Sequence, residues 1–272
     1  MTYDFAATAQ EWRFRVRAAF RDLGGLARFA TQLPTASGHC HCPATIAVPP
    51  PPAGHRPAGD VSGSDTPVLL VHGYLTTEQC WGPLLHRLHR SGFRHTSCLR
   101  YNTLTTGIPE IASALARASR AAMDRTASGG VHLIGYSLGG LAVRYAVQHL
   151  GLAANALSAV TIGTPHQGTS WAKAALGPAA AQMCPGSEVL ASLPDLAVYH
   201  QVRWLFLYSD CDPVVPPASA TAGRPADAVH VPGRGHLSLL TASRTAELVT
   251  THLCRADFAA AMGVTRRLPD AA

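Results

Sequence analysis

From residue 67 onward, short apolar runs alternate with segments of helical periodicity, and this alternation constrains the fold more than any other feature of the sequence. A short run without polar positions is typical of a strand buried on both faces. Strands that alternate with helices join through right-handed crossovers, so we expect a mostly parallel sheet covered by helices on both faces. The expected strands are residues 68–71, 93–100, 131–135, 157–163, 202–209 and 229–231, and the expected helices are residues 78–90, 109–125, 138–150 and 237–254.

The N-terminal part of the chain has a different composition. Residues 9–33 place apolar side chains at helical spacing opposite arginines, which predicts an amphipathic helix. Proline and glycine then become frequent, with four consecutive prolines at 49–52. We therefore expect residues 34–66 to form a linker with one short strand at 44–48, so that residues 1–66 make up an N-terminal helix and linker.

Residues 67–272 are numerous enough to bury a core of their own, and we expect them to form one domain. The longest interval between expected strands is 164–201, which should carry a small helical cap over one end of the sheet. No apolar run approaches the roughly 20 residues that a membrane-spanning helix requires, which excludes a polytopic membrane protein.

The formal net charge is +6, and all but one of the 22 basic residues are arginine. These charges are spread along the chain instead of being gathered on one helix among aromatic residues, which argues against a nucleic-acid partner. One cluster lies in the expected N-terminal helix, where it forms either a solvated face or a peripheral contact with an anionic lipid surface. Its members are Arg13, Arg15, Arg17 and Arg21. The oligomeric state cannot be inferred from these features.

Seven cysteines are present, an odd number that cannot all pair internally. The stretch 39–42 reads His-Cys-His-Cys, but adjacent ligands do not easily surround one ion and no second pair with zinc spacing follows, so no metal site is expected. Cys80 and Cys98 could form one disulfide, although nothing in the sequence requires it. Residues 1–22 lack the apolar stretch of a secretory signal, which leaves the cytoplasm and secretion by another route both open.

The strongest local motif is Gly-Tyr-Ser-Leu-Gly at 135–139, between an expected buried strand and an expected helix. In this context the motif predicts a sharp turn that projects the hydroxyl of Ser137 above the edge of the sheet. The amide of Leu138, at a helix N-terminus, points into the same space and could stabilise an oxyanion. The alternative interpretation, an ordinary glycine turn, fits this strand-to-helix context less well.

A serine hydroxyl needs a base, and fourteen histidines are available. Catalytic groups of parallel α/β sheets lie on loops after the strands, which favours His236 in the Gly-Arg-Gly-His loop after the last expected strand. The histidines within expected strands and helices are expected to be packed or solvated. They are His86, His89, His132, His149 and His252.

The acid that orients this base should follow the preceding strand, where two aspartates lie close together. Asp212 precedes a rigid Pro-Val-Val-Pro turn that can hold a buried carboxylate against an imidazole. Asp210 is the alternative acid, and where Asp212 is the acid we expect Asp210 to be a turn or capping residue.

Ser137, Asp212 and His236 occur in the chain order expected of α/β-hydrolases. Over residues 67–255 the sequence resembles the bacterial α/β-hydrolase lipases and esterases. The resemblance rests on Val-His-Gly-Tyr at 71–74, the 135–140 motif, Gly-Thr-Pro-His-Gln-Gly at 163–168, Asp-Pro-Val-Val-Pro at 212–216 and Gly-His at 235–236. It implies an α/β-hydrolase fold for residues 67–272, and it implies that the amide of Tyr74 is an oxyanion donor beside that of Leu138.

The resemblance further implies a serine hydrolase that cleaves small-molecule or lipid carboxylic esters through an acyl-enzyme, as triacylglycerol lipases and carboxylesterases do. Such chemistry requires neither a metal nor an organic cofactor. The same three residues could also serve a thioesterase, an acyltransferase or a polyester depolymerase, because the fold does not determine the substrate. A protein that only binds hydrophobic ligands is the remaining alternative, and the residues that bind the substrate are not indicated.

Overall fold

The computed structural model describes residues 44–48 and 64–263. The expected amphipathic helix at 9–33 and the Cys-His stretch at 39–42 lie outside the described residues. The short strand expected at 44–48 is present as β1, Ala44–Val48. Within the described residues, no helix combines the length and apolar character that crossing a membrane would require.

The described residues form one sheet with the strand order β1-β3-β2-β4-β5-β6-β7. Strands β2 to β7 are parallel to their neighbours, and β1 adds to the edge by pairing antiparallel with β3. This arrangement confirms the mostly parallel sheet. The remaining strands are β2 (Val68–Val71), β3 (Thr96–Arg100), β4 (Val131–Tyr136), β5 (Ala156–Ile162), β6 (Arg203–Tyr208) and β7 (Ala228–His230).

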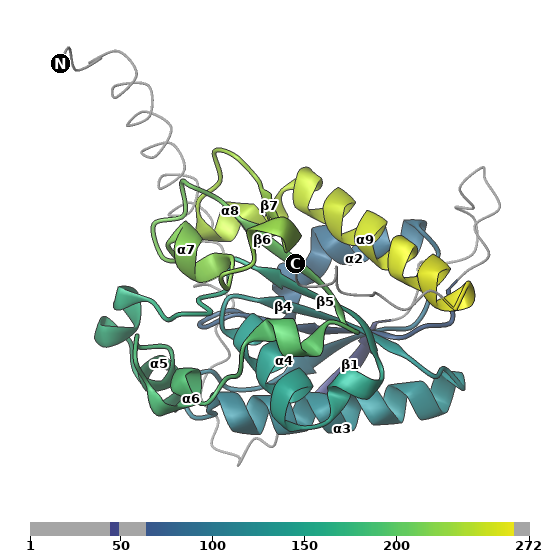
Figure 1. Cartoon of the computed structure of the whole chain (residues 1–272), viewed down its shortest axis with the longest axis horizontal. Helices are drawn as coiled ribbons and strands as arrows, with labels where there is room; N and C mark the ends of the chain where they lie inside the picture. Colours follow the sequence, from purple (N-terminus) through teal and green to yellow (C-terminus); the bar gives the residue numbers. More distant parts are fainter. Residues whose placement is uncertain (1–43, 49–63, 264–272) are drawn as a thin grey trace, which may run out of the picture.

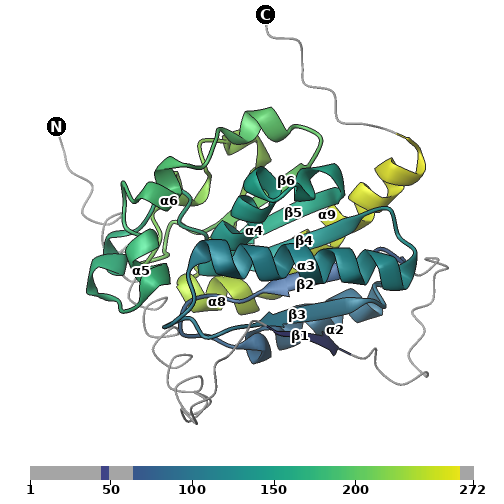
Figure 2. The same cartoon turned by 90° about the horizontal axis from the view of Figure 1, so that it is seen from below.

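Successive residues of the central strands contribute to two separate hydrophobic cores, because side chains alternate between the two faces of a sheet. Leu69 and Val71 of β2 pack into the core on the side of α3 (Ile108–Thr126) and α4 (Leu138–His149). Val68 and Leu70 pack into the core on the side of α2 (Gly82–Arg90) and α9 (Ser243–Ala261). Figure 1 and Figure 2 show these helix pairs on opposite faces of the sheet, which confirms the expected layers.

Two expected helices are each divided into two. The segment 78–90 begins with a 3₁₀ turn, η1 (Glu78–Trp81), and α2 starts at Gly82 with Pro83 in its first turn, where proline is favoured. The segment 237–254 is divided into α8 (His236–Thr241) and α9 by Ala242, whose backbone is extended. The hydroxyl of Thr245 donates to the Leu239 carbonyl across this break, at 2.6 Å.

The interval 164–201 carries four short helices, and Figure 1 shows two of them, α5 and α6, at one end of the sheet. Their bounds are η3 (Ser170–Ala174), α5 (Pro178–Gln182), α6 (Glu188–Ala191) and η4 (Leu196–Tyr199). The other short helices are η2 (Leu152–Ala154), α7 (Pro217–Ala220) and η5 (Pro225–Asp227). Cys80 and Cys98 are buried free thiols, so the disulfide considered between them is not formed.

The cap is fastened to α4 by the buried guanidinium of Arg144. It donates to the carbonyls of His166 and Pro194, at 3.2 and 2.9 Å, and to the side chain of Gln148, at 3.1 Å. Burial lowers the pKa of Arg144 to about 10, and these acceptors compensate part of the cost of burying its charge. The helix that follows Ser137 therefore also holds the cap in place.

Candidate active site

Ser137 lies in the sharp turn between β4 and α4, with φ of 51° and ψ of −119°. Few residues other than glycine adopt a positive φ, so the turn holds Ser137 in a strained conformation. The flanking glycines allow the turn to close. A Cβ atom at Gly135 would lie 2.4 Å from Gly140 Cα, and one at Gly139 would lie 2.0 Å from the Val71 carbonyl oxygen.

The three side chains expected at this edge of the sheet form one hydrogen-bonded chain. His236 Nε2 lies 3.0 Å from Ser137 Oγ, and His236 Nδ1 lies 2.7 Å from Asp212 Oδ2. Asp212 is almost fully buried and the imidazole is 14% exposed. In neutral His236 the Nδ1–H donates to the carboxylate, so Nε2 is left to accept the hydroxyl proton of Ser137.

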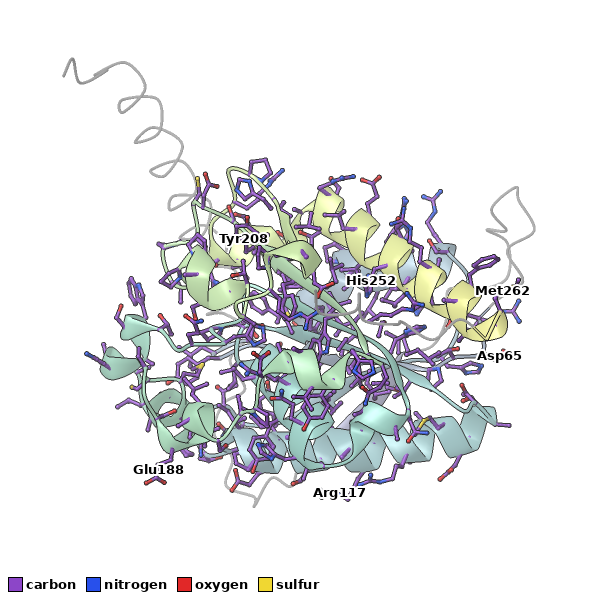
Figure 3. The ribbon with its side chains drawn as sticks, viewed as in Figure 1. Asp65, Arg117, Glu188, Tyr208, His252 and Met262 are labelled. Carbon is purple, nitrogen blue, oxygen red and sulfur yellow. The ribbon has the colours of Figure 1, made fainter. Side chains whose placement is uncertain are left out.

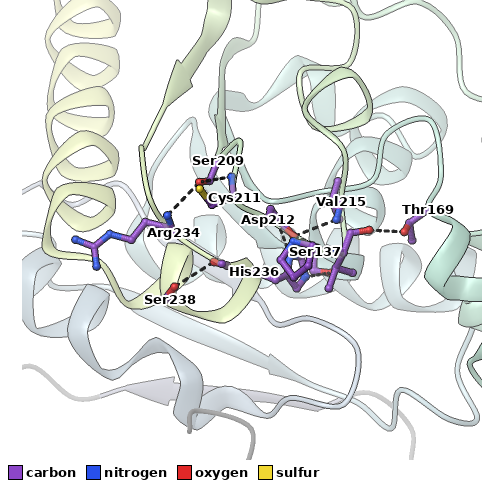
Figure 4. Close-up of polar contacts among 12 residues, drawn as sticks. Ser137, Thr169, Ser209, Cys211, Asp212, Val215, Arg234, His236 and Ser238 are labelled. Atoms are coloured by element: carbon purple, nitrogen blue, oxygen red, sulfur yellow. Dashed lines mark hydrogen bonds and ion pairs between the residues drawn. The ribbon is translucent and has the colours of Figure 1, made fainter. Parts of the chain in front are cut away.

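The second oxygen of Asp212 is bound by the turn that follows it. The amides of Val214 and Val215 donate to Oδ1 at 2.8 and 3.0 Å. The buried carboxylate therefore has protein donors on both oxygens, which offsets the cost of removing it from water. Figure 4 shows this turn beside His236 and Ser137.

Ser209, at the end of β6, was not identified from the sequence. Its hydroxyl oxygen accepts from the amides of Cys211 and Arg234, both at 3.2 Å. The first amide belongs to the loop of Asp212 and the second to the loop of His236, so one buried hydroxyl joins both loops (Figure 4).

Asp210 has a different partner from Asp212. It lies in the turn after β6, as expected for the alternative acid, and its carboxylate accepts from His230 Nε2 at 2.8 Å. Partial burial raises the pKa of Asp210, but the bonds from His230 outweigh burial and lower the pKa below its ordinary value. The bonds to His236 are thus made by Asp212, and Asp210 forms a separate, exposed contact with His230.

The two expected oxyanion donors follow neighbouring strands. Leu138 is the first residue of α4, and Tyr74 lies in the loop after β2, which pairs with β4. This loop lies beside the serine, because a Cβ atom at Gly73 would be 3.1 Å from Ser137 Cβ. The preceding residue, His72, is buried, and its Nδ1 donates to the Gly73 carbonyl at 3.0 Å.

A second chain of Ser, His and Asp residues lies elsewhere in the fold. His132 of β4 contacts Ser158 Oγ at 2.8 Å and Asp257 Oδ1 at 2.9 Å. His132 and Ser158 are fully buried, so no substrate reaches the hydroxyl, and His132 is the packed histidine that its strand position predicted. Nowhere in 44–48 or 64–263 do three or more His, Cys, Asp or Glu residues gather in a way that could hold a metal ion.

Comparison with solved structures shows an α/β-hydrolase fold. The mature lipase BlEst2 of Bacillus licheniformis is 16% identical, with a TM-score of 0.59 over 77% of this chain and 97% of that one. Lipase B of Aspergillus fumigatus is 18% identical, with a TM-score of 0.57 over 79% of this chain and 60% of that one. A thermophilic esterase from Thermogutta terrifontis is 16% identical, with a TM-score of 0.55 over 79% of this chain and 93% of that one.

The fold and the elbow serine with its hydrogen-bonded histidine thus define a serine hydrolase of the lipase, esterase and thioesterase type. More particularly, the chain belongs to the palmitoyl protein thioesterase family, whose model matches residues 67–211. The predicted α/β-hydrolase fold and the resemblance to lipases and esterases are confirmed. No curated protein matches the sequence.

Proposed function

We propose that this protein hydrolyses carboxylic esters of apolar acyl groups, with Ser137 as nucleophile, His236 as base and Asp212 as the orienting acid. The observation that carries the proposal is the hydrogen-bonded chain from Ser137 through His236 to Asp212, with the serine on a strained elbow above the sheet. This geometry fulfils the requirements for activating a serine hydroxyl.

The reaction divides into acylation and deacylation. As Ser137 Oγ attacks the ester carbonyl, His236 Nε2 takes its proton, and the amides of Tyr74 and Leu138 donate to the developing oxyanion. The tetrahedral intermediate then expels the alcohol, which receives that proton from His236. In deacylation a water molecule gives a proton to His236 and attacks the acyl-enzyme. The second tetrahedral intermediate then releases the carboxylic acid as His236 returns that proton to Ser137 Oγ. Asp212 stabilises the imidazolium in both halves.

A thioester substrate is the second candidate, and the family match supports it. The same steps apply with a thiol as leaving group. A thiol is more acidic than an alcohol and leaves with less help from His236. The two candidates therefore differ in the atom that leaves and share every residue of the mechanism.

A matched substrate pair separates the candidates. The pair is p-nitrophenyl octanoate and its thioester counterpart, which share one acyl group, and we expect a higher kcat/KM for the oxygen ester. A higher kcat/KM for the thioester would instead support thioester hydrolysis as the function.

The Ser137→Ala variant should lose roughly 10³- to 10⁶-fold in kcat on either substrate, and it should not react with a fluorophosphonate that labels the parent enzyme. Circular dichroism and thermal unfolding of the variant control for its fold. Full activity of a folded Ser137→Ala variant would exclude the proposed mechanism.

A further inference from the structure

Large apolar side chains are exposed mainly around the serine. Seven large apolar residues are exposed among the described residues, and four of them are Leu75, Leu104, Trp171 and Leu176, with exposed fractions of 45%, 44%, 59% and 74%. A single exposed leucine needs no explanation, but several on one edge of a protein indicate a binding surface. We call these four residues the apolar rim.

Three members of the apolar rim lie on segments that contact one another beside Tyr74. The Tyr74 hydroxyl donates to the Leu176 carbonyl at 2.7 Å and accepts from the Leu176 amide at 3.0 Å. A Cβ atom at Gly177, the next residue, would lie 2.2 Å from the Leu104 carbonyl oxygen. The amide of Leu75 donates to Thr103 Oγ1 at 3.2 Å. Leu75, Leu104 and Leu176 therefore belong to one continuous surface next to the proposed oxyanion donor.

Trp171 extends this surface to the other side of the site. Its indole Nε1–H donates to the carbonyl of Pro213 at 2.7 Å, directly after Asp212. Residues 171–176 therefore run from the loop of Asp212 to the loop of Tyr74. The whole apolar rim thus lies on the side of the molecule where substrate must approach.

The segments that carry the apolar rim contain few charged residues. Lys173, between Trp171 and Leu176, is the only Lys or Arg of residues 72–77, 101–109 and 169–187, and the nearest carboxylates in the chain, Glu78, Glu110 and Glu188, directly follow these segments. The chain as a whole carries a formal net charge of +6. Exposed tryptophan and leucine beside an exposed cation, on a chain of positive net charge, match the chemistry of an anionic lipid surface.

We propose that the apolar rim docks the protein on an anionic phospholipid membrane, with Trp171 and the three leucines entering the lipid interface and Lys173 among the headgroups. This contact brings the loops around Ser137 to a surface rich in acyl esters. The docking rests on the proposed function, because it names the lipid surface at which the esters are hydrolysed. Its test measures binding and does not depend on catalysis. The docking is also distinct from any contact of the N-terminal arginine cluster.

Vesicle sedimentation tests the docking with the full chain in a Ser137→Ala background, which leaves the lipid intact. The vesicles are phosphatidylcholine with about 30% phosphatidylglycerol, compared with pure phosphatidylcholine. The parent should bind the anionic vesicles, and a Leu104→Ser/Leu176→Ser variant should bind about tenfold more weakly or worse because two apolar side chains are lost. The matched control is Phe258→Ser/Met262→Ser, which removes two exposed apolar residues of 68% and 63% exposure and should bind as the parent does.

Figure 3 shows Met262 at the far end of the molecule from Glu188 in the cap, so the control pair lies away from the apolar rim. Tryptophan emission gives a local readout, because Trp171 is exposed whereas Trp81 and Trp204 are buried. The fourth tryptophan, Trp12, is replaced by phenylalanine in this experiment. Vesicles should then shift the emission of Trp171 to shorter wavelength, and Trp171→Phe should abolish that shift.

Three results would overturn the docking: absence of vesicle binding, equal binding by the apolar rim variant and the parent, or an emission shift that survives Trp171→Phe. The remaining alternative is that the apolar rim binds a second copy of the chain, and sedimentation velocity without lipid tests it. A dimeric parent that becomes monomeric only in the apolar rim variant would assign this surface to a second copy of the chain. Failure of ester hydrolysis alone would reject the proposed function and leave the docking result standing.

Discussion

At the scale of single residues, replacing each of the two aspartates after β6 should have a different effect on kcat. Asp212→Asn should lower kcat about 10³- to 10⁴-fold, because an amide cannot stabilise the imidazolium and favours the wrong tautomer of His236. Asp210→Asn removes only an exposed pair with His230, and exposed pairs contribute about 1 kcal/mol or less, so kcat should stay near that of the parent. Ester hydrolysis under saturating substrate measures both variants, and a larger loss in Asp210→Asn would reverse the assignment of the acid.

The sequence was sufficient to place these residues but not the groups that support them. Asp212 could be preferred because a rigid Pro-Val-Val-Pro turn follows it, and that turn does supply two amides to its carboxylate. Ser209 and Arg144 could not be found in this way. Each has a partner in a segment distant in the chain, Arg234 for Ser209 and Pro194 for Arg144, and a serine at a strand end or an arginine in a helix has no spacing that marks such contacts.

At the scale of elements, the approach of α4 to β2 limits what the elbow tolerates. Gly139→Ala would place a methyl group 2.0 Å from the Val71 carbonyl oxygen, so helix and strand must move apart. We expect a loss of about 3 kcal/mol in the free energy of unfolding and a fall in kcat, since the same movement displaces Leu138. Urea denaturation measures the loss. Gly129→Ala is the control, because nothing lies within 4 Å of its added Cβ and its stability should not fall.

Periodicity predicted where elements lie better than where they begin and end. Residues 109–125 differ from α3 by one residue at each end, and residues 138–150 differ from α4 by one residue at the C-terminal end, because long amphipathic patterns mark both faces of a helix. The segment 237–254 looked continuous, yet Ala242 divides it. A side-chain hydrogen bond from Thr245 to the Leu239 carbonyl accompanies the break, and such a contact leaves no mark in the apolar periodicity. The antiparallel pairing of β1 with β3 is a long-range contact, which local periodicity does not predict either.

At the scale of the whole molecule, the two ends of the sheet differ in the polar groups that they carry. The reactive side chains follow the carboxyl ends of the strands, whereas a partly buried polar cluster joins segments at the opposite end. There, Asp257 of α9 accepts from Ser64, Thr66 and His132, at 2.6, 3.0 and 2.9 Å. One carboxylate thus joins the segment before β2, the central strand β4 and the last helix.

The stability of the whole molecule should fall in mild acid because of two neutral histidines. Burial lowers the pKa of His72 to about 4, and burial followed by the charge of Arg144 lowers the pKa of His166 well below its ordinary value. Below about pH 6.5 the unfolded chain binds protons that the folded protein excludes, so acid favours unfolding. His72 alone should cost about 2 kcal/mol of unfolding free energy between pH 7.5 and pH 5.

Urea denaturation at these two pH values measures the loss of unfolding free energy. Both pH values lie above the range in which carboxyl groups with lowered pKa values take up protons. The His72→Asn variant is expected to be less stable than the parent throughout, but its difference between the two pH values should shrink by about 2 kcal/mol. His200→Asn is the matched control, since His200 is exposed and the variant should keep the full difference. An unchanged difference in His72→Asn would mean that His72 takes up its proton without unfolding, and the neutral imidazole could not then be what supports the loop of Tyr74.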